Sequence, residues 1–283
     1  MRIYISVDME GVTGLVGADD VQMGGRDYEH GRVMMTEDVN AAVRGALAAG
    51  ADSVLVNDCH STMRNLLADR IHPEAGLVRG KPKPMGMVQD LDDGFDAMLC
   101  VGYHARAGAL GVLSHSFMGH EIEDMWLDER PMGEIGFAYA TATALGVPVV
   151  MLSGDDVACA EIAEWDTRVV TAPVKHARDR FAARLLPAAE ARKLIEEAAA
   201  EGVRRATADP RPPRPPRDTT PHTLAVRWQS ASVAQQLEGI PGVTRRADDA
   251  RTVEVTGEVP ALFRLFGVFS GVAYSVTGQA PYC

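Results

Sequence analysis

Residues 2–14 read RIYISVDMEGVTG, and this stretch decides how the start of the chain folds. The apolar run 3–7 has the pattern of a strand, and it leads directly into Asp8 and Glu10 and then into glycine. Residues two apart on a strand lie on the same face, so these two carboxylates are expected to converge. Two carboxylates held close together repel each other unless a positive group lies between them. The sequence therefore indicates a metal ion, a basic side chain or a shared proton at the end of this strand.

Strand and helix patterns alternate along most of the chain. The strand patterns are nearly continuous apolar runs, which is typical of strands covered on both faces. One helix is expected to begin with Thr36 as its cap and to stop at Gly50. This alternation predicts an α/β fold with a mostly parallel sheet flanked by helices. The expected elements are strands at 2–8, 53–58, 97–103, 122–127 and 148–153 and helices at 36–49, 134–145 and 188–205.

A proline-rich stretch, DPRPPRPPRDTTP at 209–221, divides the chain. So many prolines exclude a helix or a central strand, so we expect an exposed connector. The sequence thus predicts an α/β domain over 1–208, which carries the candidate metal-binding residues, and a smaller C-terminal αβ unit over 222–283. The elements expected in the smaller unit are a strand at 223–228, a short helix, a strand pair around 243 and 252–256, and an apolar helix near 261–269.

Composition narrows the partners that the protein would take. A formal net charge of −11 over 283 residues argues against nucleic acid, because phosphate binding needs clustered Lys and Arg. No stretch suggests a membrane span or a signal peptide, so we expect a cytoplasmic protein with no membrane partner. Four scattered cysteines form no CxxC pair and are expected to be free thiols in a reducing compartment: Cys59, Cys100, Cys159 and Cys283.

Metal-ligand residue types follow three of the predicted strands. Asp8 and Glu10 end the first, His60 in NDCHS follows the second, and His104 in GYHA follows the third. Ligands bind at the carboxyl ends of the strands in open parallel sheets, and imidazole with carboxylate suits zinc or a similar divalent ion. Each residue alone has an ordinary structural explanation, such as a helix cap, an ion pair or a turn histidine. Their joint position at one sheet edge favours a metal site.

Two further residues fit the same site. His115, in LSHSF, lies in a segment that can fold back over the strand ends. Glu134, in RPMGEIG, stands at a predicted helix start, where it faces the positive end of the helix and could supply another oxygen ligand. A simple N-terminal carboxylate is the alternative interpretation of Glu134.

The motifs SVDMEGVTG, VNDCHS, GYHA, SHS and RPMGE, in this order and with these gaps, resemble the zinc D-aminopeptidases of the DppA family of metallopeptidases. The resemblance is strong over residues 1–156. It implies removal of N-terminal D-amino acids from short peptides and ring-like homo-oligomers. Cys59 departs from the family pattern, which commonly has serine there. The resemblance also implies two zinc ions per chain held by Asp8, Glu10, His60, His104 and Glu134, with His115 as the catalytic residue.

Other readings stay open at this point. The unperturbed pKa of histidine suits proton transfer, so His115 could be a proton carrier or the direct nucleophile. Binuclear metal centres also hydrolyse phosphate esters and small amides, although the chain has no GxxxxGK[ST] loop. A non-catalytic metal-binding or peptide-binding protein is the third possibility. A histidine in addition to five ligand positions argues against it, because a structural site needs no such residue.

Overall fold

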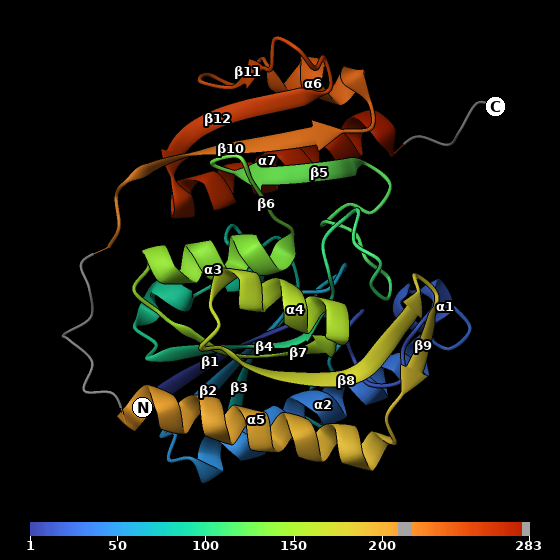
Figure 1. Cartoon of the computed structure of the whole chain (residues 1–283), viewed down its shortest axis with the longest axis vertical. Coiled ribbons are helices and arrows are strands. Elements are labelled where there is room, and N and C mark those ends of the chain that lie inside the picture. Colours follow the sequence, from blue (N-terminus) through green and yellow to red (C-terminus); the bar gives the residue numbers. More distant parts are fainter. Residues whose placement is uncertain (209–216, 279–283) are drawn as a thin grey trace.

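The computed structural model describes residues 1–208 and 217–278 and holds two sheets, stacked with a helical layer between them (Figure 1). Residues 209–216 of the predicted connector, and Cys283, lie outside the described residues. The larger sheet has seven strands in the order β3-β2-β1-β4-β7-β8-β9, and the smaller has five in the order β11-β12-β10-β5-β6.

All neighbouring strands of the larger sheet run parallel except the last pair, β8 and β9. In the register of the sheet, Tyr4 of β1 lies between Leu55 of β2 and Met98 of β4. The predicted fold class, a mostly parallel sheet flanked by helices, is confirmed. The strands are β1 (Arg2–Val7), β2 (Ser53–Asp58), β3 (Ala75–Val78), β4 (Ala97–Tyr103), β7 (Val149–Asp155), β8 (Val170–Asp179) and β9 (Ala182–Leu185).

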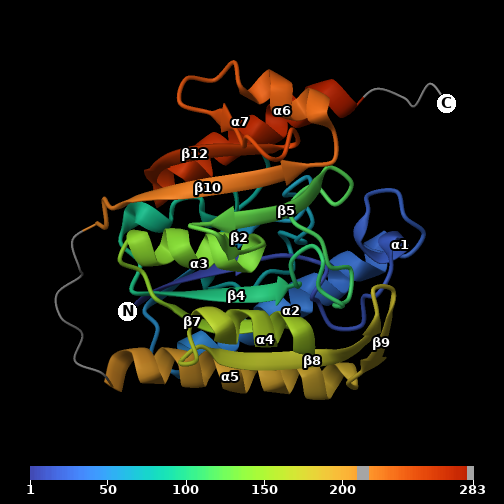
Figure 2. The same cartoon turned by 45° about the horizontal axis from the view of Figure 1, so that its top comes forward.

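Helices cover both faces of this sheet. Helices α2 (Tyr28–Ala48) and α5 (Ala188–Ala208) pack side by side on one face, and α3 (Glu134–Ala144) and α4 (Asp156–Trp165) lie on the other (Figures 1 and 2). Apolar residues of β1 alternate between the two cores, with Tyr4 on the α3 side and Ile3 and Ile5 on the α2 side. The remaining short helices are α1 (Ala18–Val21), η1 (Gly86–Val88) and η2 (Leu91–Asp93).

Helix α2 begins at Tyr28, eight residues before the predicted cap, so the prediction for Thr36 is wrong. The Thr36 hydroxyl lies inside the helix and donates to the carbonyl of Arg32 at 2.8 Å. The earlier turns contain Gly31, a weak helix former, which hid the start of the helix. A glycine is needed there because a Cβ on Gly31 would lie 2.2 Å from the carbonyl oxygen of Asp20.

The smaller sheet combines strands from two distant parts of the chain. Strand β10 (Pro221–Trp228) pairs antiparallel with β5 (Ile122–Leu127) on one side and with β12 (Thr252–Glu258) on the other. The predicted C-terminal unit is thus completed by two strands from the range 1–208, and the division of the chain into domains at these limits stays a prediction. The other elements here are β6 (Arg130–Pro131), α6 (Ala231–Leu237), β11 (Thr244–Arg245) and α7 (Val259–Thr277).

Helix α7 corrects one expectation from the sequence. It has 19 residues and a mean hydropathy of 1.5, so it is long and apolar enough to cross a bilayer by length and composition. Only 39% of that segment is buried. The core helix of a soluble protein can pass the same test, so the match is weak evidence for a membrane span.

Phe263 and Phe266 of α7 are buried, and they pack on the rings of Phe137 and Phe117 at centroid distances of 4.6 and 4.5 Å.

Candidate metal centre

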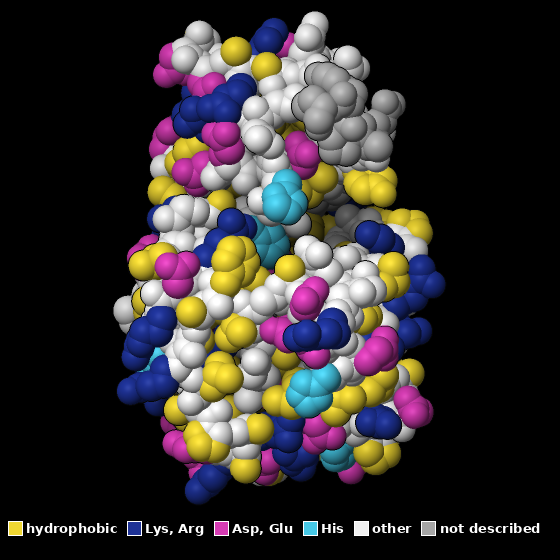
Figure 3. All heavy atoms as spheres, turned by 90° about the vertical axis from the view of Figure 1, so that its right-hand side faces the viewer, with side chains coloured by type: hydrophobic (Ala, Val, Ile, Leu, Met, Phe, Trp, Pro, Cys, Tyr) yellow, Lys and Arg dark blue, Asp and Glu magenta, His cyan; other side chains and the backbone are white. Residues whose placement is uncertain are grey.

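Three parallel strands deliver polar residues to one edge of the larger sheet. Val7 lies beside Asp58 of β2 and Val101 of β4, so the residues that follow these strands meet at the carboxyl edge. Figure 3 looks onto this side of the molecule, where histidine side chains reach the surface at the level at which the two stacked parts meet. The edge is therefore where the predicted site residues come together.

A close backbone approach holds the loop after β1 against β4. The amide of Gly11 donates to the carbonyl of Gly102 at 2.8 Å. A Cβ on Gly11 would lie 1.9 Å from the carbonyl oxygen of Tyr103, which no side chain could occupy. Glycine at this position thus lets the Asp8–Glu10 segment lie directly beside the strand that carries His104.

All five predicted ligands are buried, and they form two neighbouring groups of contacts. His60 Nε2 lies 3.0 Å from Glu10 Oε1. His104 Nε2 lies 3.3 Å from Asp8 Oδ2 and 3.2 Å from Glu134 Oε1. Side chains that follow β1, β2 and β4 therefore converge with one from the start of α3, as the sequence predicted.

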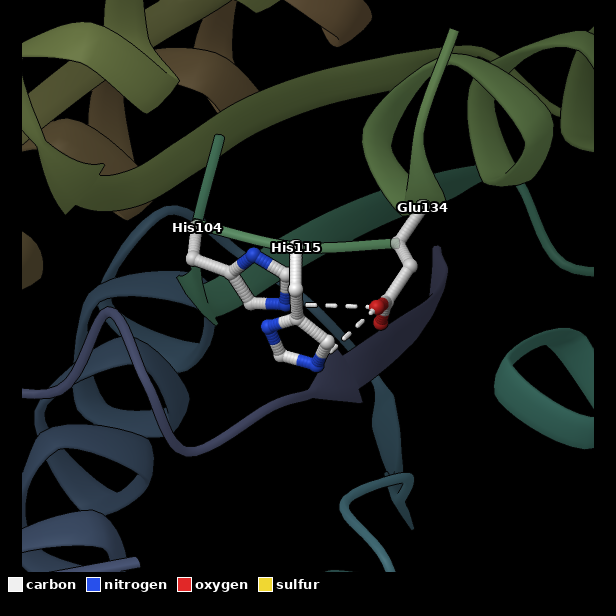
Figure 4. Close-up of side chains that lie close together, drawn as sticks. All are labelled: His104, His115 and Glu134. Carbon is white, nitrogen blue, oxygen red and sulfur yellow. Dashed lines mark ion pairs between the residues drawn. The ribbon is translucent and has the colours of Figure 1, made fainter. Parts of the chain in front are cut away.

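His115 completes the cluster from the segment after β4, which folds back over the site as expected. Its ring stacks on that of His104, with centroids 4.2 Å apart and planes 7° from parallel. His115 Nε2 lies 3.8 Å from Glu134 Oε1, and Figure 4 shows both imidazoles directed at this carboxylate. Each ring has Nδ1 beside a backbone carbonyl: Ala105 for His104, at 2.9 Å, and Leu113 for His115, at 2.8 Å. A carbonyl only accepts, so Nδ1 carries a proton in both rings and Nε2 is the nitrogen directed into the site.

Glu134 is the first residue of α3, and its carboxylate turns into the site. Its Oε1 accepts a hydrogen bond from the amide of Phe117 at 2.6 Å. Burial alone would raise the pKa of Glu134, but the contact with protonated His104 outweighs burial and lowers that pKa. A Cβ on the preceding Gly133 would lie 2.6 Å from Arg106 Cβ, so glycine allows α3 to start this close to the His104 loop.

The carboxylates and imidazoles of the site share protons, and each shifts the pKa values of its neighbours. Burial, followed by the charges of Glu10 and Glu134, raises the pKa of Asp8 to about 7. Burial would lower the pKa of His60, but Glu10 raises it to about 9. Three carboxylates held together in a buried place are a favourable environment for a cation.

The donor atoms themselves fit a divalent metal. Asp8 Oδ2, Glu10 Oε2 and His104 Nε2 are buried and have no hydrogen-bond partner among the described residues. A buried polar atom without a partner lowers the stability of the folded protein, and a bound cation would remove this penalty. Two triads have donor atoms within 4.8 Å of one another: Asp8, Glu10 and His104, and His104, His115 and Glu134. Imidazole nitrogen and carboxylate oxygen are the donor set of zinc.

Two residues near the site have structural roles that were not evident from the sequence. Lys175 of β8 is fully buried and donates to the carbonyls of Glu10, Val12 and Leu15 at 2.6, 2.9 and 2.6 Å, which fixes the loop after β1. A lone lysine in the run VTAPVKHA is the signal that could have identified it. Cys59 points away from the site, with Sγ 3.2 Å from Ser6 Oγ, and burial raises its pKa to about 12. It is therefore no competing metal ligand.

Known proteins are similar to this chain in sequence and in fold. The profile of the peptidase M55 family, described as D-aminopeptidase, matches residues 1–268. A D-aminopeptidase of Bacillus subtilis (strain 168) is 44% identical over 197 residues, which cover 70% of this chain and 72% of that one. A solved structure described as the Zn-dependent D-aminopeptidase DppA from Bacillus subtilis, a self-compartmentalizing protease, is similar with a TM-score of 0.90 and 35% identity, covering 100% of both chains.

These matches agree with the resemblance carried by the five motifs. The family model spans all six predicted site residues and reaches into α7, so it covers both sheets. The prediction of an enzyme that hydrolyses peptide bonds is confirmed, while the roles of single residues stay predictions. The chain belongs to the D-aminopeptidase family of peptidases.

Proposed function

We propose that this protein is a zinc-dependent aminopeptidase that removes N-terminal D-amino acids, such as D-Ala, from short peptides at a two-metal centre. One observation carries the proposal: buried carboxylates and imidazoles converge at the sheet edge, and several of their oxygen and nitrogen atoms have no hydrogen-bond partner among the described residues. The name of the 44% identical relative and the zinc dependence named for the 35% identical structure support it.

The contacts suggest how two ions would share the ligands. His60 and Glu10 lie together on one side, and His104 and Glu134 lie together on the other. Asp8 lies beside His104, and with Glu10 and His104 it forms one of the two triads of close donor atoms. Each pair would hold one ion, and Asp8 would contribute a carboxylate to both.

His115 is assigned to the chemistry rather than to metal binding. Zinc, when bound, supplies Lewis acidity, which polarises a peptide carbonyl and favours loss of a proton from water. Burial and the charge of His104 lower the pKa of His115, which favours the neutral form of its imidazole. The Leu113 carbonyl holds the proton on Nδ1, which leaves Nε2 free to accept a proton or to attack.

The burial of the site also bears on the substrate. The ligands lie at the carboxyl edge of the sheet, beneath the segment that carries His115 and beside the start of α3. A free N-terminal amine in its neutral form carries a lone pair, which zinc held by these residues would accept as a ligand. We therefore propose that the substrate amine enters this cluster, while the rest of a short peptide lies outside it.

A paired assay tests the function. Purified protein is given D-Ala-D-Ala, L-Ala-L-Ala and a simple phosphate ester, each with and without a chelator, and zinc per chain is measured on the same preparations. We expect turnover of the D-dipeptide alone, lost with the chelator and restored by zinc. Hydrolysis of the phosphate ester alone would indicate a different binuclear hydrolase. Zinc content without any hydrolysis would indicate a binding protein.

We also propose that the protein is cytoplasmic and forms a homo-oligomer. Cys59, Cys100 and Cys159 are buried free thiols, which agrees with a reducing compartment. The similar structure is described as a self-compartmentalizing protease. The outward face of α7 leaves Val268 53% and Tyr274 72% exposed, and such apolar exposure is typical of contact surfaces between chains.

A further inference from the structure

The backbone next to His115 is held from both sides. The amide of Leu113 donates to the carbonyl of Arg180, at the tip of the β8–β9 hairpin, at 2.7 Å. The carbonyl of the same Leu113 accepts the hydrogen bond of His115 Nδ1. Leu113 has a φ of 54°, in the left-handed region that leucine seldom adopts. A conformation of this kind persists only where neighbouring structure enforces it.

Asp155, the last residue of β7, is a second anchor of this segment. One oxygen accepts from the amide of Ala158 at 2.8 Å, as the N-cap of α4. The other accepts from the amide of Val112 at 2.6 Å, directly before Leu113. The carboxylate is 1% exposed, and both of its oxygens are used. A Cβ on Gly111 would lie 3.1 Å from this carboxylate, so the segment passes as close as glycine permits.

We infer that Asp155 and the tip of the β8–β9 hairpin are positioning elements for His115. Together they fix Val112 and Leu113 in a conformation that the chain would not adopt alone. The Leu113 carbonyl then sets both the tautomer and the plane of the imidazole, so that the ring stacks on His104 and Nε2 faces Glu134. The inference rests on the proposed function in one respect, the assignment of His115 to the chemistry.

A purely structural role is the competing explanation for Asp155, because capping α4 stabilises the fold in any case. Asp155→Ser separates the two roles. Serine is as good an N-cap as aspartate, but its single, shorter hydroxyl cannot also accept from Val112. Asp155→Asn is nearly isosteric and keeps one carbonyl oxygen for the cap, but it turns an NH₂ group toward the Val112 amide.

A second variant leaves Asp155 untouched. Replacing residues 178–182 by Asn-Gly leaves the Ala177–Ala183 pair on either side of a two-residue turn and removes the carbonyl that holds Leu113. The tip is exposed, with Phe181 59% accessible, so a shorter turn is compatible with the fold. Ser230→Ala is the matched control, because it removes a helix N-cap from α6 without touching the segment 111–115.

The experiment measures kcat, KM, zinc per chain and melting temperature for the full-length variants on D-Ala-D-Ala, together with the ¹⁵N chemical shifts of the His115 ring. We expect kcat to fall about 10²-fold in Asp155→Ser and in the short-hairpin variant, with zinc and KM unchanged and the Nδ1–H tautomer lost. Ser230→Ala should keep kcat.

Normal kcat and unchanged ring shifts in both folded variants would overturn the inference. A fall in melting temperature without a change in kcat would likewise assign Asp155 to capping alone. His115→Ala is run beside them. If its turnover is normal, the assignment of His115 in the proposed function has failed; if it is inactive while both positioning variants are normal, only this inference has failed.

Discussion

Single atoms of the histidines support the proposed division between metal ligands and a proton-transfer group. His104 and His115 both give the Nδ1 proton to a backbone carbonyl, so both present Nε2 to the site. His104 Nε2 lies within 3.3 Å of two carboxylates, whereas His115 Nε2 lies 3.8 Å from one. The more distant ring is also the one whose pKa is lowered, by burial and by the charge of its neighbour. Two stacked imidazoles of one shape are thus suited to different tasks.

The first prediction concerns His115. His115→Ala should keep its zinc and its fold but lose about 10²–10⁴-fold in kcat, because it removes the proton-transfer group and no assigned ligand. Zinc per chain and turnover of D-Ala-D-Ala are measured on one preparation. His115 also belongs to a triad of close donor atoms. A zinc-free variant would therefore make it a ligand, and a zinc-loaded variant with normal turnover would remove it from the mechanism.

Asp8 gives the second prediction. Asp8→Ala should lose metal and activity together, because it removes the assigned bridge between the ions. His60→Ala and His104→Ala should also bind less metal, since each removes one donor nitrogen. Elemental analysis of the folded variants measures this, with Asp69→Ala, a change at an exposed carboxylate, as control. Two zinc ions per chain in Asp8→Ala would contradict the bridging role.

At the scale of the elements, the contacts that fix the loop after β1 matter more for the position of the predicted ligands than the strand itself does. The loop after β1 is fixed by the Gly11–Gly102 hydrogen bond and by the ammonium of Lys175, which uses three donors on three carbonyls of that loop. Burial lowers the pKa of Lys175 to about 8, so a desolvated cation is kept in the core to hold backbone oxygens. The position of Glu10 is therefore set by β4 and β8, not by β1 alone.

The third prediction tests this junction. Gly11→Ala forces the loop away from β4, so it should cost about 2–3 kcal/mol of stability and weaken zinc binding. Gly257→Ala in β12 is the control, because its Cβ would meet Leu262 at an ordinary 3.5 Å. Thermal unfolding and chelator competition measure the two effects. Wild-type zinc affinity in Gly11→Ala would mean that the close approach does not position the ligands.

The sequence predicted helices and strands correctly where the local apolar pattern matched the burial of the element in the fold. Strands β2 and β4 match their predicted limits, and the six site residues converge because polar residues follow apolar runs at one edge. Strand β8 was missed, because Pro173 and Lys175 interrupt its apolar pattern and only tertiary contacts justify them. The pairing of β5 with β10 could not be predicted either, because periodicity indicates a strand but not which strand it pairs with.

At the scale of the whole molecule, the smaller unit supports the site in the larger one. Phe117, two residues after His115, packs on Phe266 of α7 and gives its amide proton to Glu134. Movement of α7 would therefore be felt by a proposed ligand. Phe117 and Glu134 thus form one of the links between the two stacked parts.

The fourth prediction concerns assembly. The protein should sediment as a homo-oligomer, because the similar structure is described as self-compartmentalizing and α7 leaves apolar residues exposed. Analytical ultracentrifugation at micromolar concentration should give a mass several times the 30.4 kDa of one chain. A single species of 30.4 kDa would contradict the assembly and leave the site proposal intact.

The pairing of β5 with β10 also has a consequence during protein synthesis. Strand β5 leaves the ribosome about a hundred residues before its partner, which at typical elongation rates is a delay on the order of ten seconds. During that interval the buried side of β5, with Ile122, Met125 and Leu127, has no strand to cover its edge. Unpaired edges of this kind recruit other nascent chains. Fragments that end before residue 221 should thus collect as inclusion bodies, and slower translation at low temperature should lengthen the exposure unless a chaperone covers the strand.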